Sequence, residues 1–100
     1  MGVNLSFDGS HMVALINGDI DHHSAKEIRQ TIDESIRKYS PRNLSLDFSG
    51  VPFMDSSGIG LIMGRFKEMA AIKGKLKVVN IPKRLERMIK LSGLGALGIF

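Results

Sequence analysis

The first part of the chain has the hydrophobic pattern of two β-strands. Leu5 and Phe7 alternate with polar residues and predict a short first strand. The continuous apolar run at 12–16 predicts a second strand that is buried on both faces. Asp-Gly-Ser at 8–10 is a turn signal, so the two segments are expected to form a hairpin, which Asn-Gly-Asp at 17–19 ends.

A helix is predicted after the hairpin, because apolar residues recur there at helical spacing. Its stripe consists of Ala25, Ile28, Ile32, Ile36 and Tyr39. The helix has two possible N-cap residues. One is Asp21, and the other is Ser24 with Glu27 completing a capping box. Ser40 and Pro41 end the helix, because a residue that precedes proline avoids the α conformation.

A strand, a helix and another strand are predicted next. The third strand contains Leu44, Leu46 and Phe48 and is closed by residues 49–52. The second helix extends from about residue 56 to residue 73, and its apolar stripe is Ile59, Ile62, Met63, Phe66, Met69 and Ala70. Gly74 is expected at the C′ position of this helix, and residues 76–80 predict the fourth strand.

The last part of the chain predicts a third helix, with Pro82 at its N1 position and Gly93 at its end. Its inward positions are Leu85, Met88, Ile89 and Ser92. The tail at 94–100 is apolar up to its last residue. Such a tail is expected of a truncated chain or of a last strand without its sequel, and it leaves an edge of the sheet uncovered.

The order of these elements predicts an α/β fold in a single domain, residues 1–100. Strands that alternate with helices favour parallel pairing with right-handed crossovers, whereas the opening hairpin is antiparallel. We therefore expect a mixed β-sheet flanked by helices.

Composition narrows the class of protein. The content of 43% hydrophobic and 24% charged residues is ordinary for a soluble globular domain. The chain contains no cysteine, which excludes disulfide scaffolds, thiolate catalysis and thiolate metal sites. The N-terminus lacks the features of a signal peptide, and no segment approaches the ~20 apolar residues of a membrane span. A cytoplasmic protein without a membrane partner is expected.

Charge is distributed unevenly along the chain. Residues 1–50 carry five Lys/Arg and seven Asp/Glu, a net charge of −2, and residues 51–100 carry nine and three, a net charge of +6. The basic residues of the second half fall at solvent-facing positions of ordinary elements, and the chain has no Trp and one Tyr. A solvated surface is therefore favoured over direct binding of nucleic acid.

The segment from Met54 to Gly60 holds the main candidate chemistry. Asp55, Ser56 and Ser57 lie where the third strand passes into the second helix. Backbone N–H groups at the start of a helix favour an anion, so the helix would tolerate a phosphate on Ser57. Helix capping is the commoner role of such serines, and the residues alone favour it over a phosphorylation site. Either Asp55 or Ser56 can be the N-cap residue, which would place Ser57 in the first turn.

Enzymatic interpretations of this segment fail on spacing. A nucleophile elbow needs Gly two residues before Ser, but Asp55 and Met54 occupy those positions. No Lys-Ser or Lys-Thr follows the glycines, which excludes a Walker phosphate loop. We expect no catalytic residue and no cofactor.

Three glycines in the predicted second helix require an explanation, since each costs about 1 kcal/mol relative to Ala. They are Gly58, Gly60 and Gly64. Either they let the helix pack closely on the sheet, or Gly58 and Gly60 let a partner chain approach closely. The two explanations carry equal weight.

Polar residues also follow the second strand. His22 and His23 adjoin Asp19 and Asp21, but their spacing matches no defined metal site, so we expect a solvated loop and no metal. Parallel strands gather their carboxyl ends at one edge of a sheet. This acidic loop is therefore expected near Ser57, where the two segments would make one contact surface.

Four segments together resemble the STAS-domain anti-sigma-factor antagonists. They are Gly-Asp-Ile-Asp-His-His at 18–23, Leu-Asp-Phe at 46–48, Phe-Met-Asp-Ser-Ser-Gly-Ile-Gly at 53–60 and Gly-Arg-Phe-Lys at 64–67. The similarity extends from about residue 5 to residue 98 and is greatest to the antagonists of the sporulation sigma-F pathway in Bacillus-type bacteria. The resemblance implies a mixed sheet flanked by helices, in agreement with the order of elements.

The resemblance also implies a function. A member of this family binds a cognate anti-sigma factor that is also a serine kinase, and the sigma factor is thereby released. The kinase uses its own ATP to phosphorylate the second serine of the Asp-Ser-Ser-Gly motif, which is Ser57 here. The phosphorylated form no longer binds well, and a PP2C-type phosphatase restores the original form.

Other residues match the partner-facing region of the family. They are Asp21, Asp55, Ser56 and Gly58, and Gly60 joins them as a point of close approach. We therefore expect a non-enzymatic switch protein. The alternative is a STAS module that binds a partner or a ligand in another signalling assembly. One departure from the family is that a further strand and helix usually follow the Ser-Gly-Leu segment, whereas this sequence ends at Phe100.

Overall fold

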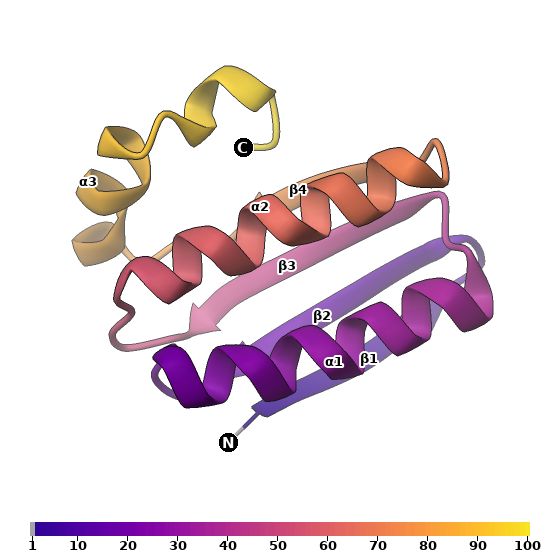
Figure 1. The fold of residues 1–100 in the computed structure, drawn as a ribbon, viewed down its shortest axis with the longest axis horizontal. Helices are drawn as coiled ribbons and strands as arrows, with labels where there is room; N and C mark the ends of the chain where they lie inside the picture. The colour runs from indigo at the N-terminus through magenta and orange to yellow at the C-terminus, as the bar shows by residue number, and fades with distance from the viewer. Residues whose placement is uncertain (1) are drawn as a thin grey trace.

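The computed structural model describes residues 2–100 and confirms the predicted hairpin. Strands β1 (Gly2–Asp8) and β2 (His11–Asn17) pair antiparallel, with Asp8 opposite His11 at the turn (Figure 1). Gly9 in the turn has a φ of 63°, a left-handed conformation that glycine adopts without steric cost.

Two further strands complete the sheet. Strand β3 (Asn43–Gly50) pairs parallel with β2, and β4 (Lys75–Val79) pairs parallel with β3, so the strand order is β1-β2-β3-β4. The parallel pairs are connected through α1 (His22–Tyr39) and α2 (Ser56–Ala71). The predicted α/β class, the element order and the mixed sheet are all confirmed.

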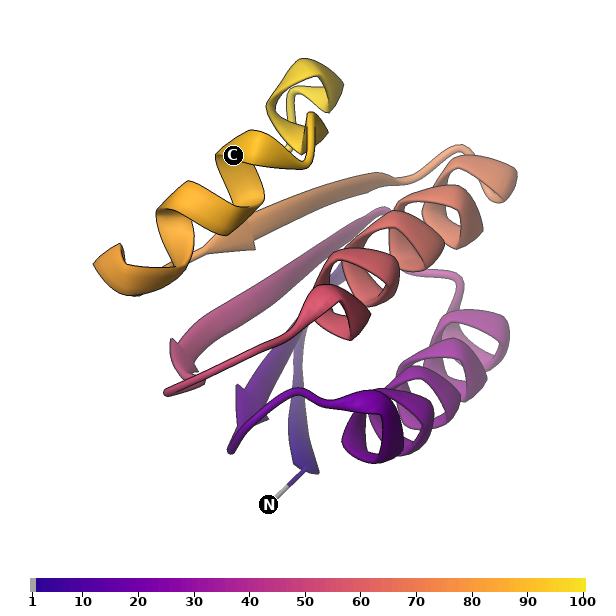
Figure 2. The same cartoon turned by 60° about the vertical axis from the view of Figure 1, so that its left-hand side comes forward.

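Both crossover helices lie side by side on one face of the sheet, whereas α3 (Lys83–Leu91) and the short 3-10 helix η1 (Leu94–Leu97) lie beyond β4 on the other side (Figures 1 and 2). The prediction that β2 is buried on both faces is therefore wrong. Its helix-facing residues Met12, Ala14 and Ile16 are fully buried, but Val13 and Leu15 are only half-buried. Among residues 2–100, no helix has both the length and the apolar character needed to cross a bilayer.

The core lies between the sheet and the two crossover helices. It is built from the inward side chains of β2 and β3 and from the isoleucine stripe of α1, which was predicted correctly. Its largest fully buried members are Phe48, Met12, Ile16, Ile20, Ile28, Ile32, Ile36, Leu44, Leu46, Met54, Ile62 and Met69. The loop residues Ile20 and Met54 belong to this core, so the segments that follow β2 and β3 are anchored rather than loose.

Tyr39 was predicted on the buried stripe of α1 but is exposed. Its ring packs against Phe7 of β1, with 4.7 Å between the ring centroids. The helix ends at Tyr39 as predicted, because Ser40 adopts the left-handed conformation with a φ of 43°. The last turn of α1 therefore extends past the core and covers the hairpin instead.

The buried face of α2 is rotated from the predicted stripe. Leu61, Ile62, Arg65 and Met69 are buried, whereas Ala70 is exposed. The predicted stripe omitted the buried Leu61 and Arg65, and a hydrophobicity pattern could not have included the charged Arg65. Three of its members are only half-buried: Ile59, Met63 and Phe66.

The end of α2 also differs from the prediction. Lys73, not Gly74, has the left-handed conformation, with a φ of 59°. The N–H groups of Lys73 and Gly74 donate to the carbonyls of Ala70 (3.0 Å) and Met69 (2.8 Å), which is the Schellman pattern. Gly74 is needed for space, because a Cβ there would lie 3.1 Å from the Arg42 carbonyl oxygen.

Helix α3 starts one residue later than predicted, because Pro82 is its N-cap residue rather than N1. Leu85 and Ile89 are buried as predicted, whereas Met88 and Ser92 are exposed. The expectation that the apolar tail leaves β4 uncovered is wrong in part. The tail folds back, and the Val78 N–H of β4 donates to the Ile99 carbonyl at 2.7 Å.

Candidate functional site

The candidate site is built where β2 and β3 end. Beyond these parallel strands the two chains pair once more, at Ile20 and Met54. The Ile20 N–H donates to the Phe53 carbonyl at 3.0 Å, and the Asp55 N–H donates to the Ile20 carbonyl at 3.1 Å. These bonds hold the loop before α1 against the loop before α2. The predicted juxtaposition of the two acidic loops is thus present in the structure.

Asp21 caps α1 and decides between the two predicted starts. Its carboxylate accepts hydrogen bonds from the N–H groups of His23 and Ser24, both at 2.9 Å. The Ser24 hydroxyl in turn accepts from the Asp21 N–H at 2.9 Å and donates to the Asp19 carbonyl at 2.8 Å. The bond from the Ser24 N–H is the main reason that the pKa of Asp21 lies below its usual value. The exposed Asp21 side chain is therefore a fixed anion beside the second loop.

Asp55 caps α2, which leaves the two serines free of that role. The Asp55 carboxylate accepts from the Ser57 N–H at 2.7 Å, and its carbonyl accepts from the Gly58 N–H at 3.0 Å. Ser56 is exposed and Ser57 is half-buried in the first turn of the helix. Within residues 2–100, neither serine hydroxyl takes part in a hydrogen bond. Capping, the role that the residues alone favoured, does not explain why serines occupy these positions.

The glycines of α2 divide into two kinds. A Cβ at Gly58 would lie 2.5 Å from the sulfur of the buried Met54, so internal packing explains this glycine. A Cβ at Gly60 or Gly64 would meet no atom within 4 Å. Nothing inside the fold requires these two glycines, and Gly60 is exposed beside the serines. Close packing therefore accounts for Gly58 but not for Gly60 or Gly64, and the approach of a partner chain at Gly60 stays a prediction.

A groove of about 320 Å³ opens between α1 and α2 beside Ser57. His22, Lys26 and Arg29 line it from α1, together with Ala25. From α2 it is lined by Ser57, Gly60 and Leu61. The groove exists because Ala25 and Gly60 leave room between the helices. It brings three basic side chains of α1, none of which the sequence singled out as a group, next to the candidate serine.

A buried ion pair lies further along the same two helices and was missed from the sequence. Arg65 Nε of α2 is 2.8 Å from Asp33 Oδ1 of α1, and both residues are buried. The contact does not meet hydrogen-bond geometry, and Arg65 Nη1 has no partner among the described residues. Burial raises the pKa of Asp33, and the opposing charge of Arg65 only partly offsets that effect. The spacing from Leu61 to Arg65 is the one sequence signal that could have indicated its inward position.

The histidines are divided between the two ends of the strands, since His22 lines the groove and His11 lies at the far end. His22 and His23 lie with their ring centroids 6.1 Å apart, and residues 2–100 contain no cluster of three potential metal ligands. A serine–histidine contact does occur, between His11 Nε2 and Ser45 Oγ at 2.9 Å. These two residues lie near the starts of β2 and β3, at the opposite end of the strands from Ser57.

Comparison with known proteins identifies the fold family. The sequence model of the STAS domain matches residues 3–98, and this chain belongs to the STAS domain family. The chain is 30% identical over 96 residues to the anti-sigma F factor antagonist of Paenibacillus polymyxa, an alignment that covers 92% of this chain and 82% of the relative.

Two solved structures of SpoIIAA are similar to this one. The unphosphorylated form of that anti-sigma factor antagonist superposes with a TM-score of 0.83 at 30% identity, over 94% of this chain and 83% of the other. The phosphorylated form of this Bacillus cell fate determinant gives a TM-score of 0.75 at 30% identity, over 94% and 86%. The resemblance found in the sequence is therefore confirmed at the level of family and fold.

Proposed function

We propose that this chain is an anti-sigma-factor antagonist whose binding is switched by phosphorylation of Ser57. The observation that carries the proposal is the Ser57 side chain itself. Its hydroxyl is unused by the fold, while its N–H is held by Asp55, at the edge where two anchored loops meet. The names of the relatives, and the existence of SpoIIAA in phosphorylated and unphosphorylated forms, support the same function.

The proposed contact surface consists of the exposed parts of the two loops. Asp21, Asp55, Ser56, Ser57 and Gly60 reach this surface. Gly58 is buried against Met54, so we assign it the role of placing the helix start rather than of touching the partner. The open backbone at Gly60 would let a partner chain approach α2 closely.

A phosphate on Ser57 is expected to change binding more than folding. It adds about −1.5 to −2 charges beside Asp55, yet two unit charges ~6 Å apart in water repel by only about 0.7 kcal/mol. The N–H groups of the first helical turn offset part of this cost. A partner packed on the same turn would have to accommodate the bulk of a desolvated dianion, and each ~1.4 kcal/mol lost weakens binding tenfold.

The proposed partner is an anti-sigma factor with serine kinase activity, which holds the ATP. The kinase would transfer the γ-phosphoryl group to the Ser57 hydroxyl, and a PP2C-type phosphatase would remove it. The chain itself supplies the acceptor oxygen and the surface that the partner recognises, with no catalytic group of its own.

Intact mass measurement tests the phosphorylation site. The chain is incubated with its anti-sigma kinase and Mg-ATP, and one phosphate is expected on the wild type and on Ser56→Ala, but none on Ser57→Ala. Ser56→Ala is the matched control, since Ser56 is adjacent and also lacks a hydrogen bond through its hydroxyl. An adduct that persists in Ser57→Ala would refute the site assignment.

Capture by the immobilised anti-sigma factor tests the switch. Ser57→Asp is expected to weaken capture at least tenfold, whereas Ser57→Ala retains it, because only the aspartate adds charge and bulk to the turn. Equal capture of both variants would contradict the proposed mechanism even if Ser57 is the phosphorylated residue.

A further inference from the structure

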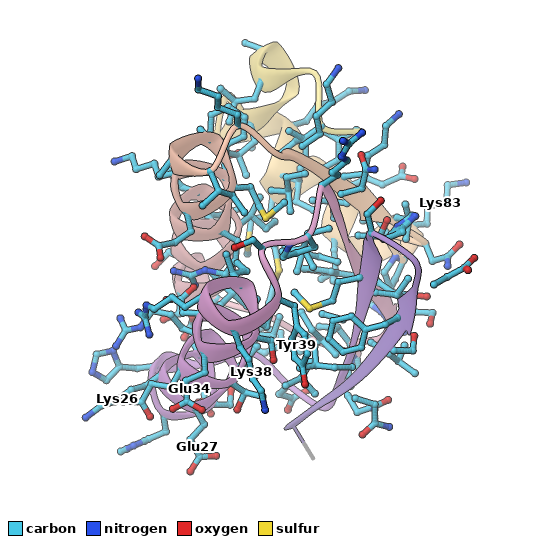
Figure 3. All side chains as sticks on the ribbon, turned by 90° about the vertical axis from the view of Figure 1, so that its right-hand side faces the viewer. Lys26, Glu27, Glu34, Lys38, Tyr39 and Lys83 are labelled. Carbon is cyan, nitrogen blue, oxygen red and sulfur yellow. The ribbon has the colours of Figure 1, made fainter. Side chains whose placement is uncertain are left out.

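The groove beside Ser57 has a marked positive character. Lys26 and Arg29 are three residues apart and therefore project from the same side of α1, and His22 lies one turn before Lys26. Both long side chains are exposed, and Figure 3 shows Lys26 extending away from the sheet. The first turn of α1 contains no acidic residue that would neutralise them.

These cations form no salt bridge within residues 2–100, although the charge of Arg29 also acts on Asp33, one turn further along α1. The ion pair found within residues 2–100 joins Arg65 and Asp33, and no carboxylate lies within salt-bridge distance of Lys26 or Arg29. The carboxylate at the start of α2, that of the N-cap residue Asp55, accepts the Ser57 N–H. Two cationic side chains therefore face the groove with their hydrogen-bond donors available.

A phosphoryl group on Ser57 would enter this groove from the opposite wall. It would carry three strong acceptor oxygens, which suit the forked guanidinium of Arg29 and the ammonium of Lys26. The missing side chain at Gly60 keeps the space between the two walls open. Flexible Lys and Arg stems can follow a helix surface while the charged end moves to a new partner.

We propose that Lys26 and Arg29 bind the phosphoryl group of phosphorylated Ser57 within the same chain, with His22 at the edge of the groove. This inference rests on the proposed phosphorylation of Ser57. Binding in the groove joins the second turn of α1 to the first turn of α2 through the phosphate. It also neutralises two cations that lie beside the proposed contact surface, so phosphorylation alters both that surface and its border.

Phosphorus NMR on a chain with phosphoserine installed at position 57 during translation tests the inference. Because nearby cations favour the dianion, the phosphate's second ionisation, normally at about pH 6, is expected at lower pH in the folded chain than in the urea-unfolded chain. The double substitution Lys26→Gln/Arg29→Gln is expected to raise the folded midpoint by about 0.5 to 1 pH unit.

The matched control is Lys38→Gln, which removes one positive charge at the far end of α1, where Lys38 lies over the Tyr39 ring (Figure 3). Its midpoint should stay at the wild-type value. The His22 ring lines the same groove, so its ring protons are followed in the same samples. The neighbouring carboxylates Asp21 and Asp55 are unchanged in every variant.

The inference is overturned if the double variant moves the midpoint no further than Lys38→Gln does, or if folded and unfolded wild type titrate alike. The second comparison needs no substitution and so does not depend on how a variant folds. Because phosphoserine is installed without a kinase, failure of the kinase to modify Ser57 would refute the proposed function while leaving this measurement intact. A null NMR result would leave phosphorylation itself standing.

Discussion

Removing the charge of Arg65 should destabilise the chain strongly, because Asp33 would be left buried without its partner. The two side chains are 5% and 12% exposed, and they join α1 to α2 at 2.8 Å (Arg65 Nε to Asp33 Oδ1). The substitution Arg65→Met keeps a long apolar stem in the interhelical space and deletes only the guanidinium.

The magnitude follows from the geometry of the pair. At 2.8 Å and an effective dielectric constant of about 20, the gross attraction is about 6 kcal/mol. Desolvation of the two ions costs several kcal/mol each, so the intact pair contributes little net stability. Removing only the guanidinium has a larger effect, because the buried Asp33 carboxylate then has no opposing charge. We expect Arg65→Met to lower the free energy of unfolding by about 3–5 kcal/mol at neutral pH.

The loss should depend on pH in a defined direction. Burial holds the pKa of Asp33 above its unfolded value of 3.8, although Arg65 opposes that effect. A group whose pKa is raised on folding favours the folded state most below the unfolded pKa, and this contribution is lost as pH rises through the folded pKa. Without Arg65 the folded pKa rises further, so the deficit of Arg65→Met should be small at acid pH and grow toward neutrality.

Urea unfolding followed by circular dichroism measures this deficit at a series of pH values. Glu34→Gln is the matched control, since it removes a carboxylate from the exposed position next to Asp33 (Figure 3), and it should change the unfolding free energy by less than about 0.5 kcal/mol. The double variant Asp33→Leu/Arg65→Met should recover most of the loss, because it leaves no unpaired charge.

Two results would refute this reasoning. One is a deficit for Arg65→Met that stays constant from acid to neutral pH, which would indicate lost packing instead of an uncompensated carboxylate. The other is a double variant as unstable as Arg65→Met alone, which would mean that Asp33 is not the group left unpaired.

Three further predictions concern the start of α2. Gly58→Ala should lower the free energy of unfolding by about 1–3 kcal/mol, since its Cβ would overlap the buried Met54. Gly60→Ala should raise it by up to about 1 kcal/mol, because that position is open and alanine favours a helix. Chemical denaturation compares the two variants. Asp55→Ala should lose about 1 kcal/mol through the missing N-cap bond to the Ser57 N–H, and Asp55→Asn should retain most of that stability in thermal unfolding. Phosphoserine at Ser57 should change the unfolding free energy by less than about 1 kcal/mol in urea titration, since the helix start tolerates an anion.

A specific result would contradict each of these three predictions or the part of the proposed function that depends on it. A Gly60→Ala chain that is more stable yet binds the anti-sigma factor as well as the wild type would remove Gly60 from the proposed contact surface. An Asp55→Asn chain as unstable as Asp55→Ala would show that charge, not the cap bond, holds the turn. Unfolding on phosphorylation would replace the proposed surface switch with a folding switch.

The elements of this fold could be predicted from the sequence because their signals are local. Alternation, helical spacing, the proline after Ser40 and the turn at 8–10 each act within a few residues. They were sufficient for the strand and helix order, the hairpin and the mixed sheet. The same local rules failed at Tyr39 and Ala70, because burial there depends on what lies opposite the helix.

The candidate site was predictable in part for the same reason. The motif around Asp55 and Ser57 is contiguous, and its position between a strand and a helix was evident from the pattern. Which residue caps α2 was not, because Ser and Asp have similar capping preferences and only backbone geometry selects Asp55. The ion pair of Asp33 with Arg65 could not be foreseen, since the two residues are 32 positions apart and both look like surface charges.

By itself, then, the sequence determined the α/β class, the element order and the family to which the chain belongs. Only the tertiary structure decided which of two helix starts is used, which glycine is required by packing, and which charges lie buried or face Ser57. The physical reason is that hydrogen-bonding geometry and hydrophobic period are properties of neighbouring residues. The packing of α1 beside α2, which creates both the basic groove and the buried pair, is a property of the folded chain alone.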